Sequence, residues 1–394
     1  MAEKYKIGII GTGQRGADYI RLLKDHPGVE CAALCDTSPE RLKDFALSMG
    51  CEGIPLFTSL DELFEKSDVE GVIITTPDFT HAECAVSALK NGRDVLLEKP
   101  MAPTAPECRE VLRAQRESGK VLQIGFELRC HPLFRRIKEV VQSGMIGQLL
   151  SMNFSESLKV MHGASYMRRW HRKSSNSGGF LLAKCSHDLD LMSILAGAPL
   201  VRTASFGGLN FFTPDKMKAR FCSQCDDRGC RFRFKGEMVR MTAADEKSPS
   251  QKQFDLCVFN EDKDVVDNQQ VVLEYANGVR GTFSLNLFAP KGCRRWFIVG
   301  TNGHIAADTD SNNMTILFSD GRETVTENCV SSNTSSHQGS DLLFLNEFLA
   351  CVRNGAAPAV DPVDGLVSTV VGNAIEKARL SGEVVHIAPE EYSF

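Results

Sequence analysis

A glycine-rich turn close to the start of the chain limits the choice of fold more than any other feature. It follows an apolar run at 5–10 that predicts a buried parallel strand, and it precedes an amphipathic helix. The turn consists of Gly11, Thr12, Gly13, Gln14, Arg15 and Gly16. Asp36 lies 20 residues beyond Gly16, at the end of a second predicted strand at 29–35. Glycines at these spacings between a strand and a helix, with an acid after the next strand, are typical of a dinucleotide-binding βαβ unit.

Each residue type in this turn has a physical reason. Gly11 permits the tight turn, Gly13 lets the backbone approach a pyrophosphate, and Gly16 lets the helix pack on the strand. The N-terminus of the helix supplies N–H donors and positive potential to the phosphates. Asp36 is expected to accept hydrogen bonds from the adenosine ribose hydroxyls and to repel a 2′-phosphate, which favours NAD over NADP. Arg41, five residues further on, leaves NADP as the alternative cofactor.

Strands and helices alternate regularly through the first third of the chain. Apolar runs predict further strands at 71–75, 95–98 and 121–126, and amphipathic segments predict helices at 39–49, 81–90 and 104–118. This alternation indicates a doubly wound parallel sheet, the Rossmann type of α/β fold. We therefore assign residues 1–126 to an NAD(P)-binding domain.

The pattern changes in the remainder, residues 127–394, which we assign to a second α/β domain for substrate binding and oligomerisation. Helices are expected at 133–142, 181–195, 340–353 and 365–381, with an extended stretch from residue 149. Short β-rich runs at 271–275, 281–288, 296–299 and 314–318 predict a large, mostly antiparallel sheet. Ala276-Asn277-Gly278 predicts a tight hairpin between the first two of these runs.

Composition excludes several classes of protein. The formal net charge of -5 gives no electrostatic footprint for nucleic acid. No apolar run is long enough to span a bilayer, so we expect no membrane partner. The N-terminus is polar and leads directly into a strand, and for that reason we expect no signal peptide and a cytoplasmic protein. In that setting most of the 14 cysteines are expected to be reduced, buried thiols.

Polar segments follow two predicted strands at the edge where ligands bind in open α/β sheets. The first segment, after the strand at 71–75, is Thr75, Thr76, Pro77 and Asp78. We expect it to contact the cofactor, and the alternative is a plain strand-to-helix turn with an N-cap. The second segment is Glu98-Lys99-Pro100, at the end of the strand at 95–98.

Taken together, these motifs resemble the glucose–fructose oxidoreductase/inositol dehydrogenase/MocA (Gfo/Idh/MocA) family over essentially the full length of the chain. The matching residues are Gly11–Gly16, Thr76-Pro77-Asp78 with His81, Glu98-Lys99-Pro100, and Gly178-Gly179 leading to His187 and Asp190. The stretches 183–188 and 260–283 are similar to one subgroup of the family.

The resemblance implies reversible hydride transfer between NAD(P) and a hydroxyl of a sugar, glycoside or cyclitol. It adds His81, Glu98 and Lys99 to the expected cofactor contacts. It implies a Rossmann domain, a second domain built on a large sheet, and a homo-oligomer, a dimer or tetramer, formed through the free face of that sheet. Catalysis is implied to use the lysine of Glu-Lys-Pro together with an aspartate and a histidine four residues apart.

The chain departs from this family pattern at the aspartate. Alignment on Gly178-Gly179 and His187 places Ala183 at the position of the aspartate, with Lys184 beside it. Oxidation of a secondary alcohol needs a base for the hydroxyl proton and a positive charge for the developing alkoxide. We assign His187 as the base, Lys99 as the alkoxide-stabilising cation and Lys184 as a second donor. The alternative is that His187 is a hydrogen-bonded core residue and that Lys184 forms a surface pair with Asp188.

Helical periodicity places Lys184, His187 and Asp188 on one face of the predicted helix at 181–195. We therefore expect all three to contact the substrate. An aromatic and cationic cluster just before this helix consists of His162, Tyr166, Arg168, Arg169, Trp170 and His171. It is suited to stacking on a sugar ring, with Tyr166, Arg169 and Trp170 as substrate contacts, or it is a solvated loop.

Three cysteines with close spacing predict a metal site. Cys222, Cys225 and Cys230 form a C-x2-C-x4-C pattern in a polar, basic stretch, and Cys257 is available as a fourth ligand. Because this stretch has little apolar content with which to order itself by burial, a structural zinc ion is the expectation. Three unrelated thiols in a loop are the alternative.

Two functions of different classes remain open. The first is an NAD-dependent dehydrogenase or ketoreductase for a sugar, glycoside or cyclitol. The second is an NAD-dependent glycosidase or lyase that keeps its cofactor, oxidises a hydroxyl transiently, eliminates at an adjacent carbon and reduces the product again. A dinucleotide-binding regulator without catalysis is disfavoured, because Lys99 and His187 are both present.

Overall fold

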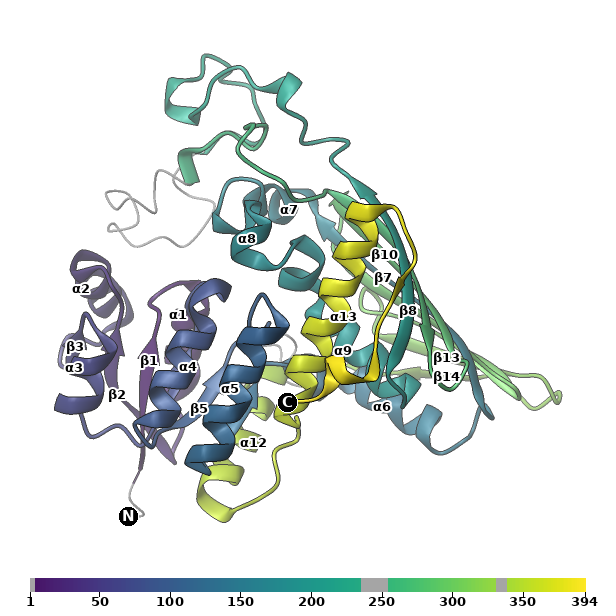
Figure 1. Cartoon of the computed structure of the whole chain (residues 1–394), viewed down its shortest axis with the longest axis horizontal. Helices are drawn as coiled ribbons and strands as arrows, with labels where there is room; N and C mark the ends of the chain where they lie inside the picture. Colours follow the sequence, from purple (N-terminus) through teal and green to yellow (C-terminus); the bar gives the residue numbers. More distant parts are fainter. Residues whose placement is uncertain (1–3, 235–253, 331–338) are drawn as a thin grey trace.

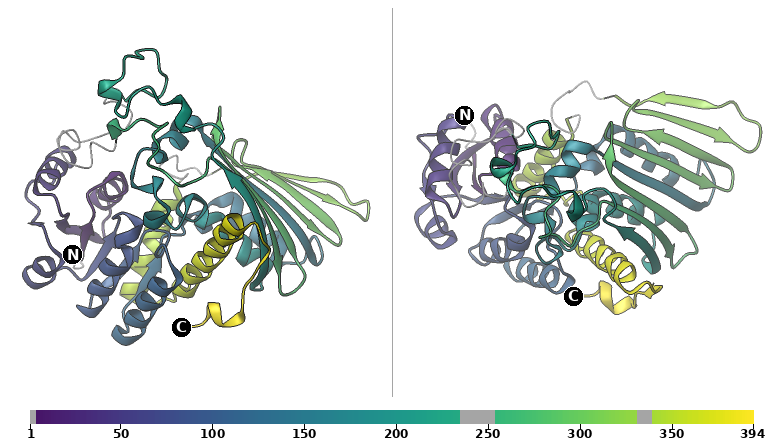
Figure 2. Two further views of the ribbon diagram at one scale, coloured as in Figure 1. Left: turned by 45° about the horizontal axis from the view of Figure 1, so that its top comes forward. Right: turned by 90° about the horizontal axis from the view of Figure 1, so that it is seen from above.

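The computed structural model describes residues 4–234, 254–330 and 339–394. Two sheets organise this part of the chain, one in each half (Figure 1). The first is a six-stranded parallel sheet with helices on both faces, and the second is a large curved sheet whose helices lie on the side facing the first half (Figure 2). The predicted α/β fold class, with a Rossmann half and a mostly antiparallel second sheet, is confirmed.

The six parallel strands of the first sheet have the order β3-β2-β1-β4-β5-β6. Their bounds are β1 Tyr5–Ile10, β2 Val29–Cys35, β3 Leu56–Phe57, β4 Gly71–Ile74, β5 Asp94–Leu97 and β6 Leu122–Ile124. Central strands such as β4 are buried along their whole length, which explains their continuous apolar runs. Strand β3 was not predicted, because it has two residues and neither of them is buried.

The helices of the first half largely match the expected segments. They are α1 Gln14–Lys24, α2 Pro39–Met49, α3 Leu60–Lys66, α4 His81–Lys90 and α5 Ala105–Ser118, with the 3-10 turn η1 at Asp78–Thr80. The start of α5 shows why these segments are helical: Thr104 and Glu107 form a capping box, and Gly119 ends the helix with φ of 64°. Helix α3 is the one that the sequence interpretation did not include.

Nine strands form the second sheet in the order β14-β13-β12-β11-β7-β10-β9-β8-β15. All neighbours in this sheet are antiparallel except β7 and β10, which are parallel. Their bounds are β7 Leu149–Lys159, β8 Leu200–Gly208, β9 Asn268–Tyr275, β10 Arg280–Ala289, β11 Cys293–Gly300, β12 Gly303–Asp308, β13 Asn313–Phe318, β14 Val325–Asn328 and β15 Val385–His386. The predicted hairpin at 276–278 joins β9 to β10, and Gly278 has the positive φ of 85° that this turn requires.

The helices of the second half pack between the two sheets. They are α6 Pro132–Gln142, α7 Val160–Tyr166, α8 Ser174–Ser177, α9 Phe180–Ala196, α12 Ser340–Asn354 and α13 Pro362–Ser381. The short 3-10 turns are η2 Glu127–Cys130, η3 Trp170–Arg172, η4 Pro214–Lys216, η5 Cys222–Gln224 and η7 Pro389–Tyr392. Helix α13 packs on α9, on β8 and on α5 of the first half, so the C-terminal helix joins the two halves (Figure 1).

Ion pairs of Arg129 connect three of the helical elements of the second half. Arg129 in η2 donates to both carboxylate oxygens of Asp190 in α9, over 2.8 and 2.5 Å, and to Asp364 in α13 over 2.7 Å. Asp190, which belongs to the family motif, therefore holds the helices together. On the other side, Gln123 at the end of the first sheet donates to the carbonyl of Phe344 in α12.

The two faces of the nine-stranded sheet differ in their surroundings. Inward side chains such as Leu273 and Phe283 are buried under α9 and its neighbours, and outward ones alternate with them along each strand. In the described part of the chain no helix covers the outward face, on which Phe206, Val272, Phe297 and Leu317 are exposed (Figure 2). Across the described residues, none of the helices has the length and apolar character that crossing a membrane requires.

Candidate active site

The glycine turn lies at the carboxyl edge of the first sheet, between β1 and α1. Gly11 has φ of 97°, and a Cβ atom there would come within 2.8 Å of the backbone of Thr75. At Gly16 a Cβ atom would lie 2.4 Å from the carbonyl oxygen of Gly11, whereas nothing lies within 4 Å of one built at Gly13. The space in front of Gly13 is therefore open, and no side chain caps the first turn of α1. Gln14 is part of this first turn and its side chain donates to Asp18.

Asp36 follows β2 and faces this turn. One of its oxygens accepts the backbone N–H and the hydroxyl of Thr12, over 3.0 and 2.8 Å. The other accepts the N–H of Ser38 and the guanidinium of Arg41, both over 3.1 Å. The carboxylate is thus buried and fixed beside the glycine turn, where the sequence places the adenosine ribose. Arg41 lies beside Asp36, and its guanidinium is the group that leaves NADP as the alternative cofactor.

The segment after β4 is tied to the glycine turn. The hydroxyl of Thr75 donates to the carbonyl of Gly11 over 2.6 Å. Thr76 and Asp78 each keep one buried side-chain oxygen without a hydrogen-bond partner among the described residues, and burial raises the pKa of Asp78 well above its usual value. Pro77 precedes η1, which Asp78 opens. Two polar atoms in this segment are therefore available to a bound group.

The side chains of His81 and Arg15 contact other parts of the protein and do not point into the space in front of the glycine turn. The ring nitrogens of His81 lie 2.9 Å from the carbonyl of Thr76 and 2.8 Å from that of Pro100. Burial lowers the pKa of His81 and the two carbonyls oppose this effect. The neutral ring donates its one N–H to one of these carbonyls, and it lies buried between the segments after β4 and β5. The side chain of Arg15 turns inward to Glu98, at 2.5 Å, and to Asp341 of α12, at 2.7 Å.

Glu98 is committed to that buried network, because it also accepts the hydroxyl of Tyr19 over 3.1 Å. Its neighbour Lys99 points the other way, toward the second half of the chain. The ammonium group of Lys99 donates to the carbonyl of Ala183 in α9 over 2.9 Å. The end of β5 and the first turns of α9, which are 84 residues apart in the sequence, thus meet at this point.

Helix α9 presents its polar side chains in two directions. Lys184 and Asp188 point to the second sheet, where Lys184 lies 3.8 Å from Glu156 of β7 and Asp188 pairs with Arg294 of β11 over 2.9 and 3.2 Å. Arg294 also lies 3.1 Å from Glu156. The expectation that Lys184, His187 and Asp188 act from one face does not hold, because His187 turns instead to η2. Asp188 is completely buried in its ion pair.

His187 contacts a carboxylate that the sequence interpretation missed. Its Nε2 lies 3.3 Å from Oε1 of Glu127, the first residue of η2, and the ring packs edge-on against Phe126. Burial lowers the pKa of His187, and Glu127 opposes this effect. Glu127 lies three residues after the end of β6, at the carboxyl edge of the sheet, and this position is the signal in the sequence that could have indicated it. Glu156 and Arg294 gave weaker signals, as charged residues at inward positions of strands.

The aromatic and cationic cluster before α9 is folded and largely buried. The rings of Trp170 and His171 stack with centroids 3.5 Å apart, and Tyr166 lies 4.3 Å from His171. Trp170 also meets Phe79 of η1 at 6.0 Å, across the two halves. The guanidinium of Arg169 lies over the ring of Phe254. The alternative of a solvated loop is therefore wrong for this segment.

Two members of the cluster differ from the rest in their surroundings. Arg168 is buried and donates to the carbonyls of Phe232 and Phe254, so it supports the fold. His162 is exposed, at the edge of the cluster, with its ring centroid 5.6 Å from that of Tyr166.

The cysteines do not form a metal centre in the described part of the chain. Across residues 4–234, 254–330 and 339–394, no group of three or more His, Cys, Asp or Glu side chains is placed to hold a metal ion. The four predicted ligands, Cys222, Cys225, Cys230 and Cys257, have free thiols. The zinc prediction is therefore not supported.

The zinc prediction assumed that the stretch around these cysteines has too little apolar content to order itself by burial. This assumption is wrong, because the stretch does bury apolar side chains. Phe212 and Phe232 are buried, with ring centroids 5.5 Å apart, and Phe259 lies 5.7 Å from Phe232. Contacts between residues that are distant in the sequence thus supply a small aromatic core.

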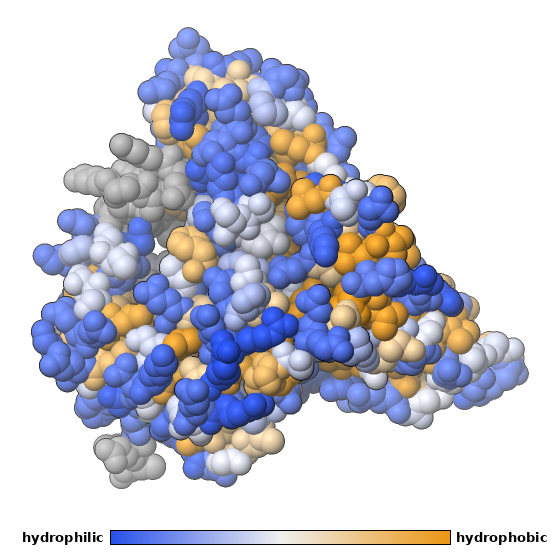
Figure 3. Space-filling view, viewed as in Figure 1, coloured by the Kyte–Doolittle hydropathy of each residue, from blue (hydrophilic) through white to orange (hydrophobic). Residues whose placement is uncertain are grey.

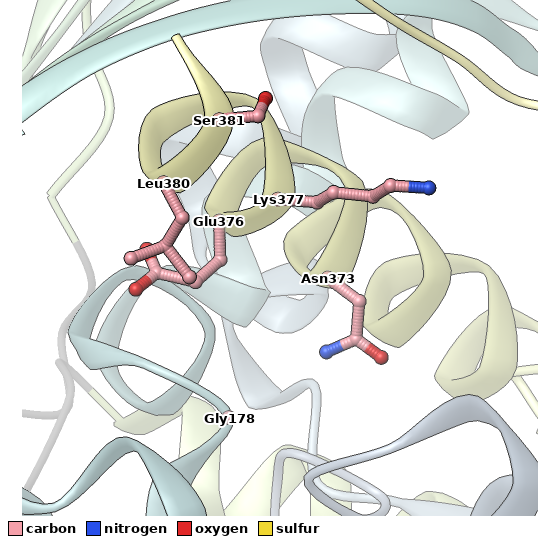
Figure 4. A pocket seen from close by; sticks show the side chains of 6 residues that line it. All are labelled: Gly178, Asn373, Glu376, Lys377, Leu380 and Ser381. Carbon is pink, nitrogen blue, oxygen red and sulfur yellow. The ribbon is translucent and has the colours of Figure 1, made fainter. Parts of the chain in front are cut away.

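A surface groove beside α13 lies apart from these residues. It is lined by Gly178, Asn373, Glu376, Lys377, Leu380 and Ser381 (Figure 4). Figure 4 shows Lys377 extending to one side of the helix and Glu376 to the other, and Arg379 already pairs with Glu376. Because its charged groups do not converge, we do not consider this groove the active site, and the region where Lys99 meets α9 remains the candidate.

Comparison with known proteins agrees with this geometry. Residues 5–126 match the model of an oxidoreductase family with an NAD-binding Rossmann fold, and residues 138–387 match the C-terminal alpha/beta domain of the same family. A scyllo-inositol 2-dehydrogenase (NAD(+)) from Bacillus subtilis is 23% identical over 98% of this chain and 97% of its own length. A 2,7-anhydro-N-acetylneuraminate hydratase from Mediterraneibacter gnavus is 30% identical over 51% of each chain.

Among solved structures, a levoglucosan dehydrogenase in complex with NADH and levoglucosan has the same fold. The TM-score is 0.76 at 18% identity, and the match covers 98% of this chain and 100% of the other. The family models together cover most of the sequence and both halves of the fold. The chain therefore belongs to the Gfo/Idh/MocA family of NAD-binding oxidoreductases.

Proposed function

We propose that the protein is an NAD-dependent dehydrogenase or ketoreductase that acts on a secondary hydroxyl of a sugar, glycoside or cyclitol. One observation carries the proposal: Lys99, at the carboxyl edge of the first sheet, reaches α9 at Ala183, one helical turn before His187. A cation, a histidine and the glycine turn are thus gathered at the edge where ligands bind in this fold.

The residues around the glycine turn fit a dinucleotide. The open space at Gly13 and the uncapped first turn of α1 suit a pyrophosphate, to which Arg15 and Gly16 offer backbone N–H groups while the Arg15 side chain stays in its ion pairs. Asp36 suits the adenosine ribose hydroxyls, which supports NAD over NADP. Thr76 and Asp78, each with an unpartnered oxygen, suit the part of the cofactor nearer to Lys99.

Bound NAD+ supplies a hydride acceptor. The chain itself provides the proton chemistry: His187 takes the hydroxyl proton, and the ammonium group of Lys99 stabilises the alkoxide that develops on the substrate oxygen. Lys184, whose ammonium group lies 3.8 Å from Glu156, would turn from the second sheet to donate to the reacting or the adjacent hydroxyl. Tyr166, Arg169 and Trp170 form the wall on which a polyhydroxylated ring would lie.

The names of relatives support a polyol substrate, because they include a scyllo-inositol dehydrogenase and a levoglucosan dehydrogenase. The test is a panel of cyclitols, free sugars and glycosides incubated with NAD+ and, in a parallel series, NADP+. Formation of reduced nicotinamide with at least one polyol is the expected result, and a Lys99→Ala control should abolish it. No reduction with any of these substrates, in a protein that binds NAD+, would contradict the proposal.

A transient redox cycle is the second candidate function, and one observation favours it: a relative with 30% identity is named a hydratase. In that case the oxidised intermediate would be reduced again before product release. The same panel separates the two functions when scored for released aglycone or dehydrated product. Net reduced nicotinamide indicates a dehydrogenase, and product formation with catalytic amounts of NAD+ and no net reduction indicates the redox cycle.

We also propose a homo-oligomer formed through the outward face of the nine-stranded sheet. Phe206, Val272, Phe297 and Leu317 are between 39% and 73% exposed there. Figure 3 shows hydrophobic residues gathered on the right of the molecule, where Figure 1 has β8 beside α13. Light scattering should give a dimer or tetramer for the wild type, and the double variant Val272→Glu, Phe297→Glu should be monomeric. A monomeric wild type would refute this arrangement.

A further inference from the structure

The pair formed by His187 and Glu127 lies deep between the two halves. The two residues are 60 positions apart, and their side chains are 6% and 3% exposed. Glu127 opens η2, three residues after the end of β6, and His187 lies in the middle of α9, so the pair forms only when the fold brings these two elements together. Nε2 of His187 and Oε1 of Glu127 are 3.3 Å apart.

The surroundings determine which ring nitrogen carries the proton. Burial lowers the pKa of His187, as do the charges of Lys99 after β5 and Arg294 of β11, whereas the carboxylate of Glu127 raises it. The ring is therefore neutral near pH 7. Since an ionised carboxylate only accepts hydrogen bonds, the proton of the neutral ring belongs on Nε2, where it faces Glu127. Nδ1 is then left with a lone pair, and it has no hydrogen-bond partner among the described residues.

A buried acceptor without a partner is uncommon in native proteins and is frequently a sign of function. The residue one turn before His187, where a helix would bring a second side chain next to it, is Ala183, which offers no acid. Glu127 of η2, and not a residue of α9, supplies the carboxylate that contacts His187. It is also faced by the guanidinium of Arg15 and the phenol of Tyr19, both from α1.

We propose that Glu127 is a positioning residue that holds His187 as the Nε2–H tautomer, so that Nδ1 is the atom that accepts the substrate proton. This inference rests on the proposed dehydrogenase function. In the step, the O–H bond of the substrate breaks and its proton moves to Nδ1, the C–H electron pair leaves as hydride to NAD+, and a C=O bond forms. The imidazolium that results is stabilised by the negative charge of Glu127.

The first test needs no substrate and therefore stands apart from the proposed function. Nitrogen-15 NMR of the full chain, with His187 assigned by a His187→Gln variant, reports the tautomer and the pKa of the ring. We expect the Nε2–H tautomer in the wild type, and a lower pKa with loss of that tautomer preference in Glu127→Gln. An Nδ1–H tautomer in the wild type, or an unchanged titration in the variant, would overturn the inference even if the enzyme oxidises a polyol.

The second test uses the substrate found by the panel. At saturating NAD+, Glu127→Gln should lower kcat about a hundredfold, at the low end of the range for general acid–base catalysis, and leave NAD+ affinity unchanged. The acid limb of the kcat profile should move to lower pH, which a merely structural role would not cause. Glu327→Gln is the matched control, because it removes an ion pair with Arg136 far along the second sheet.

A double variant guards against a simple loss of packing. Ala183→Asp restores a carboxylate one helical turn from His187, and in the Glu127→Gln background it should recover at least about tenfold in kcat. Recovery would support the role of the carboxylate. If Glu127→Gln keeps the wild-type kcat and pH profile, the inference is refuted.

Discussion

The buried ion pair between Asp188 and Arg294 allows a quantitative prediction. Asp188 is completely buried, and Arg294 donates to both of its oxygens over 2.9 and 3.2 Å. Removing one partner of a buried pair costs roughly 3–5 kcal/mol, because the other charge stays buried without compensation. Arg294 keeps a second carboxylate, Glu156, at 3.1 Å. We therefore expect Asp188→Asn to lower the free energy of unfolding by about 3 kcal/mol, the low end of that range.

Urea unfolding followed by circular dichroism measures this change. The double variant Asp188→Asn, Arg294→Met removes both charges and leaves Glu156 opposite Lys184 at 3.8 Å. It should be more stable than the single variant, because positive and negative charges are again equal in number in this cluster. Glu327→Gln, which breaks a partly exposed pair with Arg136, should change the free energy of unfolding by less than about 1 kcal/mol. A loss of under about 1 kcal/mol for Asp188→Asn would show that the pair is not the structural element described above.

Three further predictions concern the cofactor, catalysis and pH. Asp36→Ala should narrow the preference for NAD over NADP, measured as the ratio of their dissociation constants, and a wild type that binds NADP more tightly would contradict the role of Asp36. Lys99→Ala should lower kcat at saturating NAD+ by at least about a hundredfold, whereas Lys184→Ala should raise KM more than it lowers kcat; similar effects of both variants would argue against this division of roles. The buried neutral histidines should lower stability as pH drops from 6.5 toward 5, because their pKa values lie below the 6.5 of the unfolded chain and protons then bind only the unfolded form. Asp78, Glu156 and Asp190 oppose this fall, because burial raises the pKa of each of these carboxyl groups. Each such histidine contributes up to about 1.4 kcal/mol per pH unit to the slope, so His171→Gln should shift the slope of stability against pH relative to the wild type, and an unchanged slope would refute the assignment. These histidines are His81, His171 and His187.

Local sequence patterns predicted most of the first half of the fold, except β3 and α3. Strands such as β1 and β4 are short apolar runs next to glycine or polar turns, and α5 carries its own capping residues, so each element is specified by its own residues. The site residues that belong to such turns, from Gly11 to Asp36, lie together as expected. The strand β3 was not predictable, because two residues, neither of them buried, are too few to show a strand periodicity.

The interior of the site depends on contacts that no local pattern contains. Helix α9 is buried on nearly all sides, so its residues meet different neighbours in every direction and the one-face argument fails. His187 meets Glu127, and Asp188 meets Arg294, across 60 and 106 residues of sequence. The zinc prediction failed for a similar reason. It assumed that the cysteine stretch cannot order itself by burial, whereas aromatic side chains do order it, and these come together only in the folded chain.

We expect the nicotinamide end of a bound cofactor to lie beside Lys99, where the ammonium group of Lys99 meets α9, and a crystal structure of the protein with NAD+ tests this most directly. We expect the pyrophosphate against Gly13, the adenosine ribose at Asp36, and the nicotinamide ring beside Lys99 with His187 on its substrate side. Binding of NAD+ at another place, or with its nicotinamide ring directed away from Lys99, would contradict the account.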